Sequence, residues 1–333
     1  MLKNIIVSMG LRKPAKWIRD GYLLFVNYLQ DMINYYRYSN VFFDKKYEKI
    51  ESDIIMSYHS IEKGFLYKNK RERFSKLKVI ALISQLRRMN NLSILKVNTQ
   101  ISAAINILLK YYEYHEERDI NISDFFSRKD YNWLLTLAER EDFEPVCRVS
   151  KLNFYENIDK KFDEFSYSRK SIRDFSEKIV SDDLILKAIN LANNAPSVCN
   201  RQSCKNYIIQ DKSTIDKILK IQGGFSGHEK NVRKLIILVS NKNYFFSIGE
   251  RNQLYIDGGI YLMNLLYSLH FFNIAACPAN WGKCVKEDKL IRKVVNLPFN
   301  EQIICIIPVG FANDEIVYTH SKRRIAKENT VFI

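Results

Sequence analysis

The chain changes its hydrophobic pattern near residue 150, and this change limits its architecture more than any other feature. Before residue 150, apolar residues recur every three or four positions over 47–64, 75–89 and 101–117, as in amphipathic helices. Beyond about residue 165, helical patterns alternate with short β-branched runs that are typical of buried strands. We therefore predict a helical N-terminal extension, residues 1–150, and an α+β domain, residues 151–333.

The second domain is predicted to hold a sheet covered by helices. Its strand candidates are residues 206–210, 234–240, 273–277 and 302–310. Its helix candidates are residues 182–193, 253–271 and 286–296, the last of which is followed by Asn-Leu-Pro. The alternation of the two kinds of element favours a layered arrangement.

The formal net charge of +15 favours an acidic partner such as a phosphate group, nucleic acid or a membrane surface. Residues 61–90 contain nine basic and two acidic residues, which keeps open a basic protein that binds nucleic acid or anionic membrane. No nucleic-acid-binding motif accompanies this charge, so we expect no nucleic-acid partner. A general compositional bias toward Lys, Ile, Asn and Tyr is the alternative explanation of the charge.

The six cysteines form no C-x-x-C pair and have no histidine at zinc-ligand spacing, so no metal site is predicted. The N-terminus lacks a secretory signal pattern, which favours a cytoplasmic location. Residues 1–40 combine six basic and two acidic residues with many aromatic ones. They suit peripheral contact with a membrane, although packing against the rest of the protein is the favoured expectation.

Three segments carry candidate site chemistry. The first, residues 168–175 (SRKSIRDF), surrounds Ser171 with Arg169, Lys170 and Arg173, and such a set can hold a phosphate by charge-assisted hydrogen bonds. Solvated surface is the alternative role of a short basic run.

The second segment is residues 195–202 (APSVCNRQ), which follow a helix with Ser181 as its predicted cap. Pro196 ends the helix, and Ser197, Asn200 and Gln202 can meet a planar heteroaromatic ligand at its edge. An ordinary polar turn is the alternative. The third segment is the C-terminus, where Lys322, Arg323 and Arg324 precede an apolar TVFI. The apolar end suggests a packed tail whose cations are able to bind a phosphate.

Taken in order, SRKSIRDF, LANNAPSVCNRQ, YIDGGIYLMNLLYSLHFFNIAACPANWG, IICIIPVGF and the terminal KRR resemble the nitroreductase-like family of FMN-dependent oxidoreductases. The resemblance covers residues 160–333. It implies a three-layer sandwich with a central, mainly antiparallel sheet, a noncovalently bound FMN and a homodimer with flavin at the subunit interface. It also implies that NAD(P)H gives a hydride to flavin N5 and that a small-molecule acceptor then takes it.

Site residues follow from the same resemblance. Arg169, Lys170 and Ser171 would bind the ribityl phosphate and nearby polar atoms, and Arg173 would lie at the pyrimidine edge of the ring. Reduction places negative charge at that edge, which a fixed guanidinium stabilises. The remaining implied residues are Pro196, Ser197, Asn200 and Gln202 against the isoalloxazine, Asn280, Trp281 and Gly282 near N5, and Lys322 and Arg324 at the phosphate. Trp281 has an alternative role as a core or lid aromatic.

The chain also departs from the family pattern. Ser203 and Cys204 stand where Pro and Trp are usual, and Ala326 replaces a Pro. Within residues 223–234, Lys230 and Asn231 are candidate flavin contacts, and a mobile substrate loop is the alternative. The YHSIEKGF stretch resembles the H-x-I-E-K-G of family members with long helical extensions, some of them encoded among polysaccharide-biosynthesis genes. His59, Glu62 and Lys63 therefore either reach a substrate or end a helix before Gly64.

The predicted function is an FMN-dependent oxidoreductase that takes a hydride from NAD(P)H and reduces an unidentified acceptor. One alternative is an FMN-dependent dehydrogenase or oxidase that does not use NAD(P)H. The other is the basic binding protein introduced above.

Overall fold

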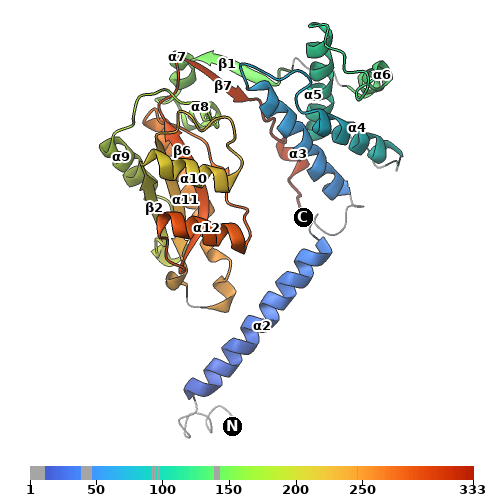
Figure 1. The fold of residues 1–333 in the computed structure, drawn as a ribbon. Helices are drawn as coiled ribbons and strands as arrows, with labels where there is room; N and C mark the ends of the chain where they lie inside the picture. Colours follow the sequence, from blue (N-terminus) through green and yellow to red (C-terminus); the bar gives the residue numbers. More distant parts are fainter. Residues whose placement is uncertain are drawn as a thin grey trace. The chain divides into compact units, whose positions relative to one another are not determined.

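The computed structural model describes residues 12–38, 47–91, 93, 95, 98–138, 143–245 and 247–333 (Figure 1). The chain divides into two compact units, one formed by Met1–Cys147 with Thr319–Ile333 and the other by Arg148–Tyr318. We call them the helical unit and the sheet unit. The predicted division at residue 150 assigns the C-terminal tail to the second domain, whereas in the structure this tail groups with the N-terminal helices.

The helical unit is built on three helices, α3 (Tyr47–Phe65), α4 (Lys76–Asn91) and α5 (Thr99–Glu116), followed by the shorter α6 (Arg128–Leu137). Most side chains of α5 are buried, and its apolar residues share one core with Ile54 and Ile61 of α3 and Leu82 of α4. Side chains cap two of these helices: Asn98 accepts the N–H groups of Gln100 and Ile101 in α5, and a capping box opens α6.

The sheet unit is a three-layer α+β sandwich, as predicted. Its sheet has the antiparallel order β2 (Cys204–Ile209), β3 (Lys234–Asn241), β6 (Glu301–Gly310) and β4 (Ala275–Ala276), and β5 (Ala279–Asn280) also pairs with β6. Successive residues of β3 face opposite cores, which explains why its sequence is a continuous apolar run.

Helices cover both faces of this sheet. On one face, α9 (Asp182–Ala192) and α11 (Gln253–Phe271) pack on Ile236 and Leu238 of β3. On the other, α10 (Lys212–Gln222) and α12 (Val285–Val295) share a core with Leu235 and Ile237. Gly258 lets α11 approach β6 closely, because a Cβ at this position would lie 2.8 Å from the Ile304 side chain.

Smaller elements join these layers. They are β1 (Val146–Ser150), which pairs with β7 (Glu315–Thr319), the helices α7 (Lys151–Tyr155) and α8 (Phe162–Ser168), and the 3-10 turns η1 (Val198–Asn200), η2 (Lys242–Tyr244), η3 (Ile248–Glu250) and η4 (Ala326–Glu328). The sequence patterns predict neither the β1–β7 pair nor α10, and β4 is shorter than the predicted strand at 273–277.

The helix α2 (Arg12–Tyr38) differs from the others because its apolar side chains stay exposed. The exposed fraction is 80% for Trp17, 67% for Phe25 and 62% for Met32. The core of the helical unit contains residues of α3 to α6 and none of α2, and the favoured expectation that residues 1–40 pack against the rest of the protein stays a prediction. Residues 1–11, 39 and 40 of the predicted 1–40 segment lie outside the described residues. None of the helices in the described part of the chain is both long and apolar enough to cross a membrane.

Candidate functional site

The basic segment that follows α8 is fixed at both of its ends. The Ser168 hydroxyl donates to the Phe165 carbonyl over 2.8 Å, and His270 Nε2 lies 2.7 Å from Ser168 Oγ. Further along, the Ile172 N–H donates to the Ala276 carbonyl, and the Ser176 N–H donates to Phe311. These bonds hold Arg169, Lys170 and Ser171 in a partly buried stretch beside the β4 end of the sheet.

Arg173 carries a buried polar atom that lacks a partner. Its Nη1 is inaccessible to water, and no acceptor among the described residues bonds to it. The Oδ1 of Asn231 is also buried and has no hydrogen-bond partner among the described residues. A buried donor without an acceptor is costly, so the site suits a ligand that presents an acceptor to Arg173. The carbonyl and nitrogen edge of a flavin pyrimidine ring has this chemistry.

His228 lies close enough to Arg173 to be affected by its charge, and the sequence analysis did not single it out. Burial lowers its pKa, and the charge of Arg173 lowers it further. Because the imidazole is held in its neutral form, the guanidinium supplies the positive charge at this place. The ring of His228 also lies 6.0 Å from that of Phe225, in the turn after α10.

The loop at 195–202 has a strained backbone. Cys199, Asn200 and Gln202 adopt positive φ angles of 49°, 55° and 48°, a region that residues other than glycine rarely occupy. The Gln202 N–H donates to Ser197 Oγ over 3.0 Å, and the Gln202 side chain donates to the carbonyl of Asn200. Arg201 adds a bidentate ion pair with Glu250 at 2.6 and 3.1 Å. Such strain persists only where the surroundings fix the conformation, and it is typical of ligand sites.

A pocket of about 190 Å³ opens beside this loop. It brings together Pro196, Ser197 and Gln202 of the predicted set, whereas Asn200 is not among its lining residues. It also contains Cys204, whose pKa burial raises to about 12, with a further contribution from the charge of Asp257. The thiol is therefore neutral and forms a wall of the pocket.

Asp257 is a site residue that sequence reasoning missed. Its carboxylate is buried beneath the loop, where it accepts the Val198 N–H at 3.3 Å and Gln253 Nε2 at 2.9 Å. The signal in the sequence is that Asp257 is the single acidic residue of α11. By fixing Val198, Asp257 holds the strained turn against the pocket.

The segment predicted to face flavin N5 runs along the edge of the sheet. Asn280 pairs with Cys305 of β6, so the chain leaves β5 at the same end of the sheet at which β2 begins after the 195–202 loop. The Asn280 carbonyl accepts Gln222 Nε2 over 3.0 Å. Asn280 and Gly282 are exposed, whereas Trp281 is buried in the core, which agrees with its alternative role.

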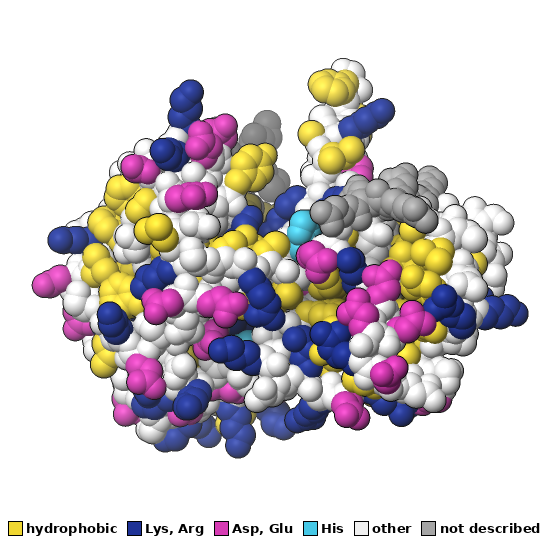
Figure 2. All heavy atoms as spheres, turned by 90° about the horizontal axis from the view of Figure 1, so that it is seen from above, with side chains coloured by type: hydrophobic (Ala, Val, Ile, Leu, Met, Phe, Trp, Pro, Cys, Tyr) yellow, Lys and Arg dark blue, Asp and Glu magenta, His cyan; other side chains and the backbone are white. Residues whose placement is uncertain are grey.

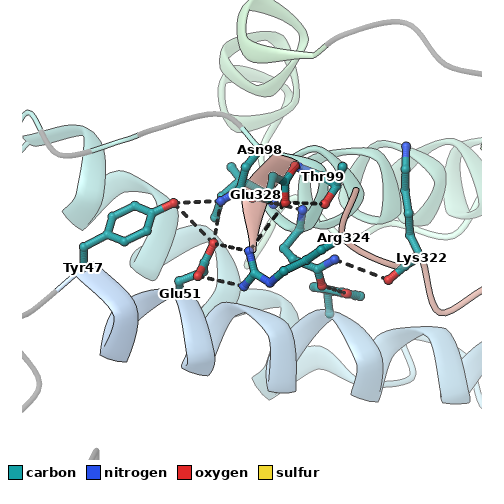
Figure 3. A network of polar contacts seen from close by, with 10 residues as sticks. Tyr47, Glu51, Asn98, Thr99, Lys322, Arg324 and Glu328 are labelled. Atoms are coloured by element: carbon teal, nitrogen blue, oxygen red, sulfur yellow. Dashed lines mark hydrogen bonds and ion pairs between the residues drawn. The ribbon is translucent and has the colours of Figure 1, made fainter. Parts of the chain in front are cut away.

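Lys322 and Arg324 lie in the helical unit, where Figure 3 shows their surroundings. Arg324 Nη2 donates to Glu51 at 2.9 Å, and Nη1 lies 3.6 Å from Glu328. Glu328 in turn accepts two hydrogen bonds from Thr99, and the Lys322 carbonyl accepts Gln100 Nε2. Burial disfavours the charged form of Glu51, but bonds from Arg324 and Asn98 outweigh this effect and lower its pKa. The Arg324 charge is thus engaged by carboxylates, and its role at an FMN phosphate stays a prediction.

The H-x-I-E-K-G stretch also binds the tail. Glu62 is fully buried, lies 2.9 Å from His59 Nδ1, and accepts the N–H of Ser321 at 3.3 Å. The helix continues past Gly64 to Phe65, so Glu62 does not end it. The structure therefore gives Glu62 a role in anchoring the C-terminal segment.

Part of the basic charge of the chain is paired with acidic side chains. Figure 2 shows Lys and Arg interspersed with Asp and Glu on the face that it presents. Within residues 61–90, Arg73 and Lys76 both pair with Asp124, and Arg87 pairs with Asp130. These pairs reduce the charge available to a nucleic acid.

A comparison with known protein families points to the same part of the sheet unit. Residues 167–234, which include the basic segment and the loop, match the model of the nitroreductase family, and the resemblance is confirmed for this stretch. No curated protein matches the chain.

Similar solved structures cover about half of the chain. A candidate NADH oxidase from Clostridium acetobutylicum is 23% identical, with 50% of this chain and 98% of that chain covered and a TM-score of 0.44. An FMN-dependent nitroreductase from Clostridium difficile R20291 is 19% identical, with 50% and 96% covered and a TM-score of 0.43. A candidate nitroreductase in complex with FMN from Desulfovibrio desulfuricans is 18% identical, with 51% and 95% covered and a TM-score of 0.42.

Proposed function

We propose that the sheet unit binds FMN and that the protein is an oxidoreductase with NAD(P)H as electron donor and a small organic molecule as acceptor. The observation that carries the proposal is the buried, unpartnered Nη1 of Arg173, which lies within the stretch that matches the nitroreductase family. Bound FMN would supply the capacity to accept and donate a hydride.

The phosphate of FMN would be held by Arg169, Lys170 and Ser171. Two cations beside a hydroxyl suit a phosphate dianion, and an arginine can bind it with two parallel hydrogen bonds. The neutral His270 supports the segment through Ser168 without adding a charge of its own. The helix α11, which carries His270, thereby orients the cations.

Arg173 would bind the pyrimidine edge of the flavin and stabilise negative charge there. A half-buried guanidinium acts strongly on such charge because little water screens it. Asp257, Ser197 and Gln202 would hold the strained loop as one wall of the flavin site, and the exposed Asn280 and Gly282 would line its other side.

The proposal includes a homodimer. The helix α11 exposes Tyr255, Ile256, Ile260 and Met263, which recur at helical spacing on a helix whose other side is buried in the core. An apolar stripe of this kind suits a two-fold symmetric contact. Light scattering measures the mass of the purified protein in solution and so tests whether it is a homodimer. The cytoplasmic location expected from the sequence stays a prediction.

FMN binding by the wild type and by Arg173→Ala tests the function. We expect both proteins to bind FMN, because the phosphate contacts remain, and we expect the variant to be reduced by NAD(P)H roughly 100-fold more slowly. Lys178→Ala removes an exposed cation from the same region and serves as the control, with an unchanged rate. Failure of the wild type to bind FMN would refute the proposal. An Arg173→Ala variant that loses most of its FMN, while its remaining holoenzyme is reduced at the wild-type rate, would remove Arg173 from this role.

A further inference from the structure

The helix α2 presents a continuous apolar surface outside any described core. Its 27 residues span about 40 Å at the usual rise of an α-helix. Six exposed or half-exposed apolar side chains follow one line along it at alternating spacings of four and three residues: Ile18, Tyr22, Phe25, Leu29, Met32 and Tyr36. Such spacing keeps them on one side of the helix.

The apolar surface is wider than this line. Trp17, Leu24 and Tyr28 lie on one flank and Val26 on the other, so that the apolar arc covers roughly 200° of the helix circumference. A contact with one other helix needs only a narrow seam, usually of aliphatic residues, and here aromatic residues supply much of the surface. The width and the aromatic content instead suit the boundary between lipid headgroups and acyl chains.

The cations near the start of α2 suit contact with anionic lipid headgroups. The first 19 residues of the chain contain five basic residues and no acidic one. Within the described helix, Lys16 and Arg19 are exposed outside the apolar arc, where Asn27 and Asp31 are half-exposed. The same side carries Leu23, which is 38% exposed, and Arg19 pairs with the neighbouring Asp20 at 2.8 Å. Cations near the start of an amphipathic helix complement anionic headgroups, each contributing about 1 kcal/mol at a membrane surface.

We propose that α2 lies in the surface of an anionic membrane, with its apolar arc inserted between the headgroups and its cations paired with lipid phosphates. The helix is not expected to cross the bilayer, because its longest stretch without ionised side chains is residues 21–30, and a crossing needs roughly 20 such residues. The partner of the apolar arc is thus the surface of a membrane. This inference does not depend on the proposed flavin chemistry.

Co-sedimentation of the full chain with vesicles tests the proposal. We expect binding to phosphatidylcholine vesicles that contain about 30% phosphatidylglycerol, much weaker binding to pure phosphatidylcholine, and a decrease between about 0.1 M and 0.5 M salt. Phe25→Glu should weaken binding by more than roughly 50-fold, because it removes a ring that would be inserted into the membrane and adds an anion. Gln30→Glu adds the same charge on the polar side and should weaken binding by at most roughly fivefold.

The variants leave the fold intact because Phe25 is exposed and lies outside both cores, and circular dichroism verifies this. Three results would overturn the proposal: no binding of the wild type to anionic vesicles, equal binding of Phe25→Glu and Gln30→Glu, or binding that is indifferent to salt and lipid charge. A solution mass that falls on Phe25→Glu, without vesicle binding, would assign the surface to a second copy of the chain.

Discussion

His270 illustrates how one buried residue organises the proposed anion site. It is 3% exposed, its ring is surrounded by Tyr155, Phe154 and Phe165, and its Nε2 bonds to Ser168. Burial, together with smaller contributions from the charges of Arg169 and Lys170, lowers its pKa to about 4. The imidazole is therefore neutral throughout the physiological range.

This shift makes stability depend on pH in a predictable direction. Because the folded pKa lies below the unfolded value of about 6.5, the unfolded chain takes up the proton first, and stability falls as the pH falls through this window. Between pH 7.5 and 5.5 the loss attributable to His270 is about 1.4 kcal/mol.

His270→Phe, which keeps an aromatic ring, should abolish this loss. Denaturant unfolding of the wild type and of the variant at the two pH values measures the difference. Above pH 5.5 most carboxylates stay ionised, so they contribute little to the change. An identical pH dependence in the two proteins would contradict the assignment.

Some site residues could be predicted from the sequence and others could not. Arg173, Ser197 and Gln202 stand in motifs of unusual composition, and the structure gives each a place that suits a ligand site. His270 and Asp257 lie on α11, where the hydrophobic pattern indicates a helix and hides two buried polar groups. Cys199, Asn200 and Gln202 adopt positive φ angles although none of them is a glycine, so the sequence does not indicate this conformation. The surrounding contacts impose it.

At the scale of elements, the C-terminal tail is held to α3 and α5 by polar contacts. Arg324 joins Glu51 of α3 to Glu328, and Glu328 joins the tail to Thr99 at the start of α5 (Figure 3). Glu62 adds a second attachment through Ser321. The tail is thus a structural part of the helical unit.

Arg324→Ala should loosen this attachment. The change leaves the buried Glu51 without its cation, which should cost about 2 kcal/mol of stability and raise amide exchange in Thr319–Ile333. Lys327→Ala, an exposed neighbour for which no contact is described, should cost little. Equal exchange in the two variants would show that the Glu51 pair does not hold the tail. The same variants, titrated with FMN, test whether Arg324 also contributes to the phosphate site.

Regular elements were the most predictable part of the fold. The helix over Gln253–Phe271 and the strand over Lys234–Asn241 have strong periodic or β-branched signals, and the structure places them where the patterns indicate. The β1–β7 pair has short strands with few buried side chains, so no pattern distinguishes it from a loop. β4 is short because only Ala275 and Ala276 pair with β6, a limit set by tertiary contacts.

At the scale of the whole molecule, composition predicted less than local pattern. The net charge of +15 could not distinguish a nucleic-acid partner from a solvated surface, and cations paired with Asp124 and Asp130 favour the latter for residues 61–90. The place of the tail could not be predicted either, because it depends on contacts between residues more than 200 positions apart, such as Glu51 and Arg324.

The central claim is that this chain holds FMN and uses NAD(P)H to reduce it. The most direct test is the visible absorption spectrum of the protein reconstituted with FMN, recorded without oxygen before and after NADH or NADPH is added. We predict flavin bands that bleach with at least one of the two nucleotides. Flavin bands that persist with both would point to a dehydrogenase or oxidase with another electron donor, and a protein that retains no FMN would contradict the account.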